Sequence, residues 1–262
     1  MSAHHPVFCR RAWILPLIPL LIWFGSRLFI TDVELFYALN QFGQHWSDGT
    51  LAFFVFLGNG WGLLALAFPL VIFAPRPLVA SAAAGLMAGL LGRILKNSLD
   101  VSRPAAVLDR ETFRIVGDVL EALSMPSGHT LTVFAIATTL YFSLKQPYRI
   151  HGIWLFGLAI ISGVTRTAVG AHWPSDVFAG AAIGLFFGLM AVQLFVKLPQ
   201  RWFDPQGWLT RLAAIMGLVS VYILATHSLE IELIKPLQTL GIVIVIATLF
   251  HFVPMTLRRR SS

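Results

Sequence analysis

The sequence predicts an all-α fold, a polytopic bundle of transmembrane helices. Of the 262 residues, 57% are hydrophobic and only 12% are charged, whereas a soluble domain of this size is about 45–50% apolar and about 25% charged. The apolar residues form long runs, as membrane-crossing helices require. Only helices and closed barrels satisfy their backbone in lipid, and the runs show no barrel-like alternation.

Eight apolar spans cover most of the chain, near residues 13–30, 51–74, 78–96, 129–144, 152–168, 177–196, 212–227 and 237–254. A basic flank precedes the first span, as in a signal peptide, but no small-residue cleavage site follows, so we interpret this span as retained. We expect residues 1–262 to form a single integral-membrane domain. Residues 1–197 would form a six-span core, and residues 198–262 a connector and two additional spans.

The distribution of Lys and Arg predicts the orientation of the bundle, because cytoplasmic loops are enriched in them. One set of tails and loops holds eleven basic residues: Arg10, Arg11, Arg76, Lys145, Arg149, Lys197, Arg201, Arg211, Arg258, Arg259 and Arg260. The other set holds eight: Arg27, Arg93, Lys96, Arg103, Arg110, Arg114, Arg166 and Lys235. The larger set includes both tails, so we expect both termini in the cytoplasm. In a bacterium the other set would face the periplasm from the inner membrane.

Composition also excludes several classes of site. The single cysteine, Cys9, excludes an internal disulfide and a cysteine-based metal cluster. The net charge is +7, but the basic residues are dispersed along the chain. We therefore expect no nucleic-acid partner, and assign the positive charge to membrane topology.

The longest connection between spans, residues 97–128, is expected on the outer side. Its stretch "DRETFRIVGDVLEALSMP" has two interpretations. It is amphipathic, and a short interfacial helix would bury one face, formed by Phe113, Val116, Leu120 and Leu123. The segment "IVGDVL" fits a hairpin that turns at Gly117-Asp118 equally well. The sequence does not decide between them.

Three polar stretches fall at span ends on this outer side. "KNSLDVSRP" (96–104) leaves the third span, "MPSGHT" (125–130) enters the fourth, and "TRTAVGAHWPSD" (165–176) joins the fifth to the sixth. Distant segments therefore converge at one depth. A transporter would place its polar site near the bilayer midplane, often within inverted repeats. No repeat is apparent here, so the pattern favours chemistry at the membrane surface.

His172 and Asp176 are candidate catalytic residues in the third stretch. Pro174 favours the first turn of the sixth span, because that position needs no N–H donor. His172 then lies just before the helix and Asp176 in its first turn. A carboxylate there accepts a proton from one ring nitrogen, which fixes the tautomer and leaves the other nitrogen free to attack.

The second stretch suits an anion and a proton donor. Pro126 is expected to open the fourth span, where Ser127 and Gly128 present backbone N–H groups at a helix N-terminus. His129 follows and can protonate a leaving oxygen.

Three cations complete the cluster: Lys96, Arg103 and Arg166. Two cations about 6 Å apart at an effective dielectric of about 20 repel by roughly 3 kcal/mol, so an anion is expected among them. Forked arginine donors suit the oxygens of a phosphoryl group.

Each residue alone also has an ordinary interpretation. An Arg near a span end usually extends toward the interface, and a lone His before a helix is usually a polar cap. Convergence of all these residues on one side favours a phosphate site. The remaining histidines receive the ordinary interpretation: His4, His5, His45, His151, His227 and His251.

These residues resemble the three-part signature of type 2 phosphatidic acid phosphatases. The signature comprises Lys96 with Arg103-Pro104, "PSGH" at 126–129, and Arg166 with His172 and Asp176. Six residues separate Lys96 from Arg103, five separate Arg166 from His172, and three separate His172 from Asp176. The match covers roughly residues 95–180. Thr165 departs from it, since the family usually has Ser there, but the hydroxyl is retained.

The resemblance implies a role for each residue. His172 would be the nucleophile that forms a phosphohistidine, Asp176 would orient it, and His129 would be the general acid. The phosphoryl oxygens would be held by Lys96, Arg103, Arg166, Ser127 and the Gly128 amide. The resemblance also implies a six-helix core and catalysis without a metal or cofactor.

The expected function is hydrolysis of a lipid phosphate or diphosphate at the outer edge of the membrane. Undecaprenyl diphosphate, phosphatidylglycerol phosphate, phosphatidic acid and lipid A 1-phosphate all fit, and the polyprenyl diphosphate is slightly preferred as a common bacterial need. The alternatives are a lipid phosphotransferase with the same site and a non-enzymatic lipid transporter. Vanadium haloperoxidases share the signature but are soluble. The expected partners are the lipid substrate and the bilayer; the oligomeric state is not predicted.

Overall fold

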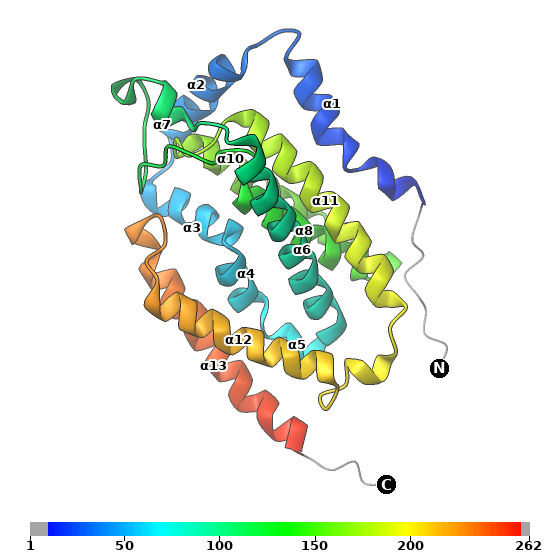
Figure 1. Ribbon diagram of the computed structural model, residues 1–262. Coiled ribbons are helices and arrows are strands. Elements are labelled where there is room, and N and C mark those ends of the chain that lie inside the picture. Colours follow the sequence, from blue (N-terminus) through cyan, green and yellow to red (C-terminus); the bar gives the residue numbers. More distant parts are fainter. Residues whose placement is uncertain (1–9, 258–262) are drawn as a thin grey trace.

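The computed structural model describes residues 10–257, and every regular element among them is a helix (Figure 1). The longer helices are α1 (Leu17–Ser26), α2 (Asp32–Gly43), α3 (Asp48–Gly58), α4 (Gly60–Ala67), α6 (Pro75–Leu99), α8 (Gly128–Ser143), α10 (Trp154–Ala168), α11 (Pro174–Val196), α12 (Trp208–Thr226) and α13 (Lys235–Leu257). Short helices are α5 (Leu70–Phe73), α7 (Pro104–Val107) and α9 (Arg149–Gly152). Single 3-10 turns cover Arg10–Ile14, Arg110–Thr112, Gln146–Tyr148, Gln200–Trp202 and Glu232–Ile234. The all-α prediction is confirmed.

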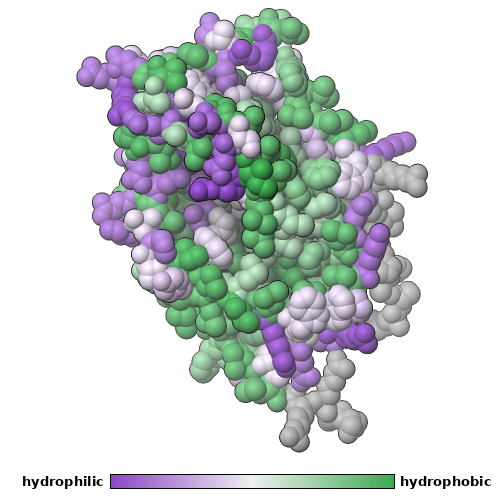
Figure 2. Space-filling view, viewed as in Figure 1, coloured by the Kyte–Doolittle hydropathy of each residue, from purple (hydrophilic) through white to green (hydrophobic). Residues whose placement is uncertain are grey.

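The protein is an integral membrane protein. Within the described residues, five helical segments are long and apolar enough to cross a bilayer: Pro75–Val107, Arg149–Ala168, Pro174–Val196, Trp208–Thr226 and Glu232–Leu257. The bent pair α3 and α4 reaches the same length and hydropathy only when its two helices are taken together as one span. The first expected span corresponds to a shorter apolar helix, Arg11–Ser26, and the fourth to α8, which has 16 residues and does not reach the length and apolar character of a membrane span. Figure 2 shows hydrophobic residues over the middle of one face and polar residues gathered around α2 and α7.

The second expected span, 51–74, is not one continuous helix. α3 and α4 meet at an angle of 82°. Between them, Asn59 Oδ1 accepts hydrogen bonds from Trp61 N and Gly62 N at 3.1 and 3.0 Å, which starts a new helix. An asparagine at this position satisfies amides that would otherwise have no partner. Hydropathy averaged over a span does not register this single polar cap.

α2 lies between the first two expected spans, where the sequence predicts no element. Thr31 and Glu34 form a capping box at its start, with Glu34 N donating to Thr31 Oγ1 and Thr31 N donating to Glu34 Oε2. The sequence "TDVE" is the signal for such a box. Asp32, in the same turn, accepts from Ser175 Oγ at 2.7 Å and so contacts the first turn of α11.

α8 is the central helix, and its most extensive contact is with α11. Three glycines one turn apart on α11 make this contact possible. A Cβ at Gly180 would lie 2.7 Å from Ser127 O, one at Gly188 would lie 2.8 Å from Ala135 O, and one at Gly184 would overlap Leu131 O. Small residues allow two backbones to approach closely inside a membrane. The starts of α8 and α11 are therefore held together.

The two C-terminal helices pack against α4, the second helix of the bent pair of α3 and α4. α12 and α13 lie side by side along α4 (Figure 1), and a Cβ at Gly217 of α12 would overlap the ring of Phe68. The connector is held by Arg76, whose guanidinium donates to the carbonyls of Phe195, Val196 and Leu198. Arg76 therefore caps the C-terminal end of α11. It is also one of the basic residues from which the topology is predicted. The division at residue 197 and the cytoplasmic termini remain predictions; residues 1–9 and 258–262 lie outside the described part of the chain.

We predict that Gly184→Ala destabilises the bundle by about 1–3 kcal/mol, the usual effect of overpacking a close contact. The measurement is the midpoint of thermal unfolding in detergent. Gly157→Ala on α10 is the matched control, because a Cβ there would have no neighbour within 4 Å. Equal midpoints for the two variants would contradict the role given to the α8–α11 contact.

Candidate active site

The three polar stretches were predicted to converge at one depth on the outer side. In the structure they meet at one end of the bundle. Ser127 N donates to Asp176 O at 3.0 Å, which joins the start of α8 to the start of α11. Ser124 N donates to Val101 O at 2.8 Å, which joins the segment before α8 to the segment after α6. Residues from three distant parts of the sequence thus share one site.

The connection between α7 and α8 forms neither the interfacial helix nor the hairpin that the sequence allowed. After the turn at Arg110–Thr112, the chain is irregular, with a bend at Gly117-Asp118 where Gly117 has a φ of +94°. Phe113 is buried, as the helical interpretation expected, but no helix forms. Asn40 of α2 holds the segment instead: its Oδ1 accepts from Arg114 N at 2.9 Å and its Nδ2 donates to Arg114 O at 2.8 Å. A contact with a distant helix therefore shapes this loop.

His172 lies where local sequence placed it, directly before α11. α11 begins at Pro174, and His172 N donates to Arg166 O at 3.1 Å, so the histidine is anchored to the end of α10. Its Nδ1 lies 3.1 Å from Asp176 Oδ2. The carboxylate is placed to accept the Nδ1 proton, which leaves Nε2 with its lone pair toward the site.

Asp176 is itself held by two other donors. Trp173 N donates to Asp176 Oδ2 at 2.9 Å and Ser124 Oγ donates to the same oxygen at 2.5 Å. Ser124 is not among the predicted site residues; it lies just before the "MPSGHT" stretch, and a hydroxyl beside that motif is its only signal. The side chains of Asp176 and Ser124 are both completely buried.

Arg103 faces the free nitrogen of His172. Its Nη1 lies 3.3 Å from His172 Nε2 and donates to Ala171 O at 2.9 Å, while its Nε donates to Ala122 O at 2.8 Å. Lys96, at the end of α6, donates from Nζ to the carbonyls of Leu123 and Ser124. Both cations are therefore fixed by the backbone of the segment that precedes α8.

The start of α8 differs slightly from the prediction. The helix begins at Gly128, two residues after Pro126, and Ser127 is its N-cap. Thr130 Oγ1 donates to Ser127 Oγ at 3.0 Å. His129 follows in the first turn and lines a cavity of about 170 Å³, together with Asn59, Asp118 and Glu230.

Arg166 has a partner that sequence analysis did not find. Its side chain is buried in the last turn of α10, and its Nη2 lies 2.5 Å from Glu230 Oε2. Glu230 belongs to the connection between α12 and α13. No motif marks it, because only the tertiary packing of the two C-terminal helices brings it to the site.

Burial and the three nearby cations change the pKa of His172, the candidate nucleophile. Burial, and then the charges of Arg103, Arg166 and Lys96, hold the pKa of His172 well below its usual range. The imidazole is therefore neutral near pH 7, as a nucleophile must be. No group of three His, Cys, Asp or Glu side chains that could hold a metal ion occurs among residues 10–257.

Known proteins resemble this chain in sequence and in fold. Residues 77–200 match the model of the PAP2 superfamily. The crystal structure of Aquifex aeolicus LpxE superimposes with a TM-score of 0.55 at 30% identity, covering 63% of this chain and 96% of that one. A PAP2-type phosphatidylglycerolphosphate phosphatase from Bacillus subtilis shares the fold, with a TM-score of 0.52, 17% identity and coverage of 71% and 98%.

Curated relatives match over shorter stretches. A lipid A 1-phosphatase of Rhizobium johnstonii is 37% identical over 124 residues, which are 46% of this chain and 49% of that protein. An undecaprenyl-diphosphatase of Sulfolobus acidocaldarius is 38% identical over 73 residues, 27% of this chain and 33% of that protein. The chain thus spans about half the length of the first of these relatives and a third of the second.

We predict that Ser124→Ala lowers stability by about 1.5–3 kcal/mol, because a buried carboxylate loses a charge-assisted hydrogen bond. Thermal unfolding in detergent measures the change. Ser102→Ala is the control, since Ser102 is exposed and contributes only its backbone carbonyl to Trp173 Nε1. An unfolding midpoint for Ser124→Ala as high as that of the control would show that the bond to Asp176 is dispensable.

Proposed function

Because the chain belongs to the PAP2 superfamily, we propose that it hydrolyses the phosphate or diphosphate headgroup of a membrane lipid through a phosphohistidine on His172. The observation that carries this proposal is the state of the imidazole. Its Nδ1 is engaged by Asp176, and its Nε2 faces Arg103, where a phosphoryl group would be bound. A neutral, oriented imidazole beside a cluster of cations is suited to attack phosphorus.

The reaction would proceed in two displacements. His172 Nε2 attacks phosphorus, the bond from phosphorus to the leaving oxygen breaks, and His129, which would be protonated in the complex with the anionic headgroup, gives its proton to that oxygen. His129, now neutral, then takes a proton from water as the water oxygen attacks the phosphohistidine. The N–P bond breaks, inorganic phosphate leaves, and His172 is restored. Asp176 stabilises the positive charge that His172 carries while the N–P bond exists.

The phosphoryl oxygens would be bound by the convergent donors. Lys96, Arg103 and Arg166 supply positive charge, and Ser127 and the Gly128 amide supply the N-terminus of α8. Because these groups already neutralise the phosphate charge, the mechanism needs no metal ion at the same place. Metal independence is therefore part of the proposal.

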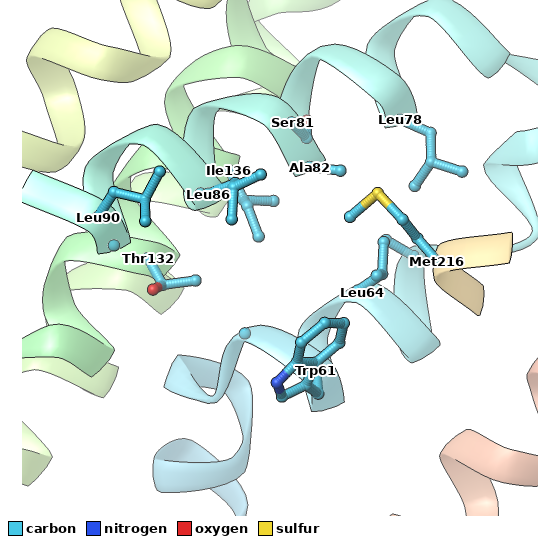
Figure 3. Close-up of a pocket in the computed structure, with 14 residues that line it drawn as sticks. Trp61, Leu64, Leu78, Ser81, Ala82, Leu86, Leu90, Thr132, Ile136 and Met216 are labelled. Carbon is cyan, nitrogen blue, oxygen red and sulfur yellow. The ribbon is translucent and has the colours of Figure 1, made fainter. Parts of the chain in front are cut away.

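The lipid tail would lie in an apolar groove below His129. The groove has a volume of about 240 Å³ and runs between α4, α6, α8 and α12. Figure 3 shows Trp61, Leu86 and Met216 around this space, which Thr132 and Ile136 of α8 also line. In hydrolysis of a lipid phosphate, the leaving oxygen carries the tail. The tail must then lie on the side of the general acid, and Thr132 is one helical turn below His129.

The names of the relatives bear on the substrate. Lipid A 1-phosphate becomes the first candidate, because the Rhizobium relative carries that name. Undecaprenyl diphosphate is the second, through the Sulfolobus relative. A phosphotransferase would use the same site if an acceptor lipid replaced water. Placement in a bacterial inner membrane, with the site on the periplasmic side and both termini in the cytoplasm, is proposed from the Lys and Arg distribution.

We predict that purified protein releases phosphate from one of these lipids in excess EDTA, and that His172→Ala reduces the rate to below a few per cent of wild type. The panel comprises lipid A, undecaprenyl diphosphate, phosphatidylglycerol phosphate and phosphatidic acid, and the readout is free phosphate. An unchanged unfolding midpoint for His172→Ala would show that the bundle is intact.

Asp176→Asn provides a second test. Its activity should fall less than that of His172→Ala, because the change disturbs the orientation of the imidazole and leaves the attacking nitrogen in place. Rapid turnover by His172→Ala would rule out the proposed nucleophile, and loss of activity in EDTA would rule out metal independence. Phosphate release only when a second lipid is present would favour the phosphotransferase.

We predict that Gly85→Leu raises KM for a long-chain substrate several-fold, because a leucine at this position fills part of the groove. A Cβ at Gly85 would have only ordinary contacts, the nearest 3.8 Å away, so the fold should tolerate the change. KM for a short-chain soluble analogue serves as the internal reference. Gly157→Leu is the matched control on an open face of α10. Equal effects on long and short substrates would place the tail elsewhere.

A further inference from the structure

The connection between α12 and α13 delivers a carboxylate to the cation cluster. Ile231 and Ile234 are 4% and 1% exposed and pack into the largest apolar cluster, so this segment is docked on the core. Asp118 N donates to Glu230 O at 2.9 Å. Gly117 is also required here, because a Cβ at that residue would overlap Glu230 O. The backbone of Glu230 is therefore fixed over the site.

The side chain of Glu230 engages the phosphate-binding groups themselves. Its Oε2 lies 2.5 Å from Arg166 Nη2, while Nε and Nη1 of Arg166 have no hydrogen-bond partner among the described residues. Glu230 also lies within electrostatic reach of Lys96 and Arg103. It lines the same small cavity as His129. An anion was expected among the three cations, and this chain supplies one.

The state of this carboxylate suits a reversible contact. Burial alone would raise the pKa of Glu230, but the Arg166 guanidinium holds the pKa below its usual range, so the group stays ionised at neutral pH. The side chain of Glu230 is 32% exposed, whereas that of Arg166 is 1% exposed. Water thus reaches Glu230, and its side chain can rotate outward while the docked backbone stays in place.

We propose that Glu230 is an intramolecular competitor of the substrate, whose carboxylate occupies Arg166 until a phosphoryl group displaces it. The proposal rests on the proposed function of the same site. Binding of the headgroup then costs the Arg166–Glu230 contact, so Glu230 weakens the affinity for phosphate. A headgroup must bring enough negative charge to replace the carboxylate that leaves. Glu230 thereby makes the site selective for phosphomonoesters and diphosphates, which carry more charge than diesters.

Glu230→Gln tests the proposal, because it removes the charge and keeps the shape. The probe is inorganic phosphate, and its Kd for the full-length protein in detergent is measured by titration calorimetry. We expect phosphate to bind about tenfold more tightly to Glu230→Gln than to wild type, a difference of about 1.4 kcal/mol. With a lipid substrate, KM should fall while kcat changes little.

Two controls locate the effect. Glu232→Gln removes a carboxylate two residues away that pairs with Lys235 at the surface, and its phosphate Kd should equal that of wild type. In an Arg166→Ala background, Glu230→Gln should no longer tighten phosphate binding, since the two side chains act on each other. If Glu230→Gln does not fold, Glu230→Asp keeps the charge but shortens its reach, and phosphate should bind it more tightly than wild type.

An unchanged Kd in Glu230→Gln would overturn the proposal. Weaker phosphate binding, or a large loss of kcat with unchanged KM, would also overturn it and would place Glu230 among the groups that assist the reaction. Phosphate binding is read without turnover, so this result is independent of whether the lipid assays and His172→Ala support the phosphohistidine mechanism.

Discussion

The glycines of α11 allow its backbone to lie directly against α8, and the geometry of the site follows from that contact. Ser127 N reaches Asp176 O only because the two helix starts are this close. The same approach brings the start of α8, with His129, to the level of His172. α6 packs on α8 as well, so its last turn delivers Lys96 to the same depth. Small side chains in the middle of the bundle thus hold polar groups in register at its end.

Electrostatics sets the second constraint on the site. Lys96, Arg103 and Arg166 are held within a largely buried region, where their mutual repulsion is weakly screened. Asp176 and Glu230 offset part of this charge, but they are bound differently. Asp176 receives donors from Ser124, Trp173 and His172, whereas Glu230 is one-third exposed and bound through Arg166. One carboxylate is therefore a fixed part of the structure and the other is exchangeable.

Sequence was informative where structure is local. Pro174 starts α11, and His172 and Asp176, four residues apart, meet across that start without help from distant segments. Hydropathy is also a local property of the sequence, and it predicted the all-α class. The break at Asn59 was missed because one polar cap hardly changes the average hydropathy of a span.

Long-range contacts limited the rest of the prediction. The loop before α8 takes its shape from Asn40, and Glu230 reaches Arg166 through the packing of α12 and α13. Neither pairing leaves a periodic signal in the sequence. The 82° break between α3 and α4 also has a kinetic consequence. Gly60 and Trp61, the first residues after the break, line the apolar groove proposed for the lipid tail. A tail held there would reach the site by lateral diffusion in the bilayer, so the rate would depend on the mole fraction of substrate in the membrane, and added inert lipid would slow the reaction by dilution in two dimensions.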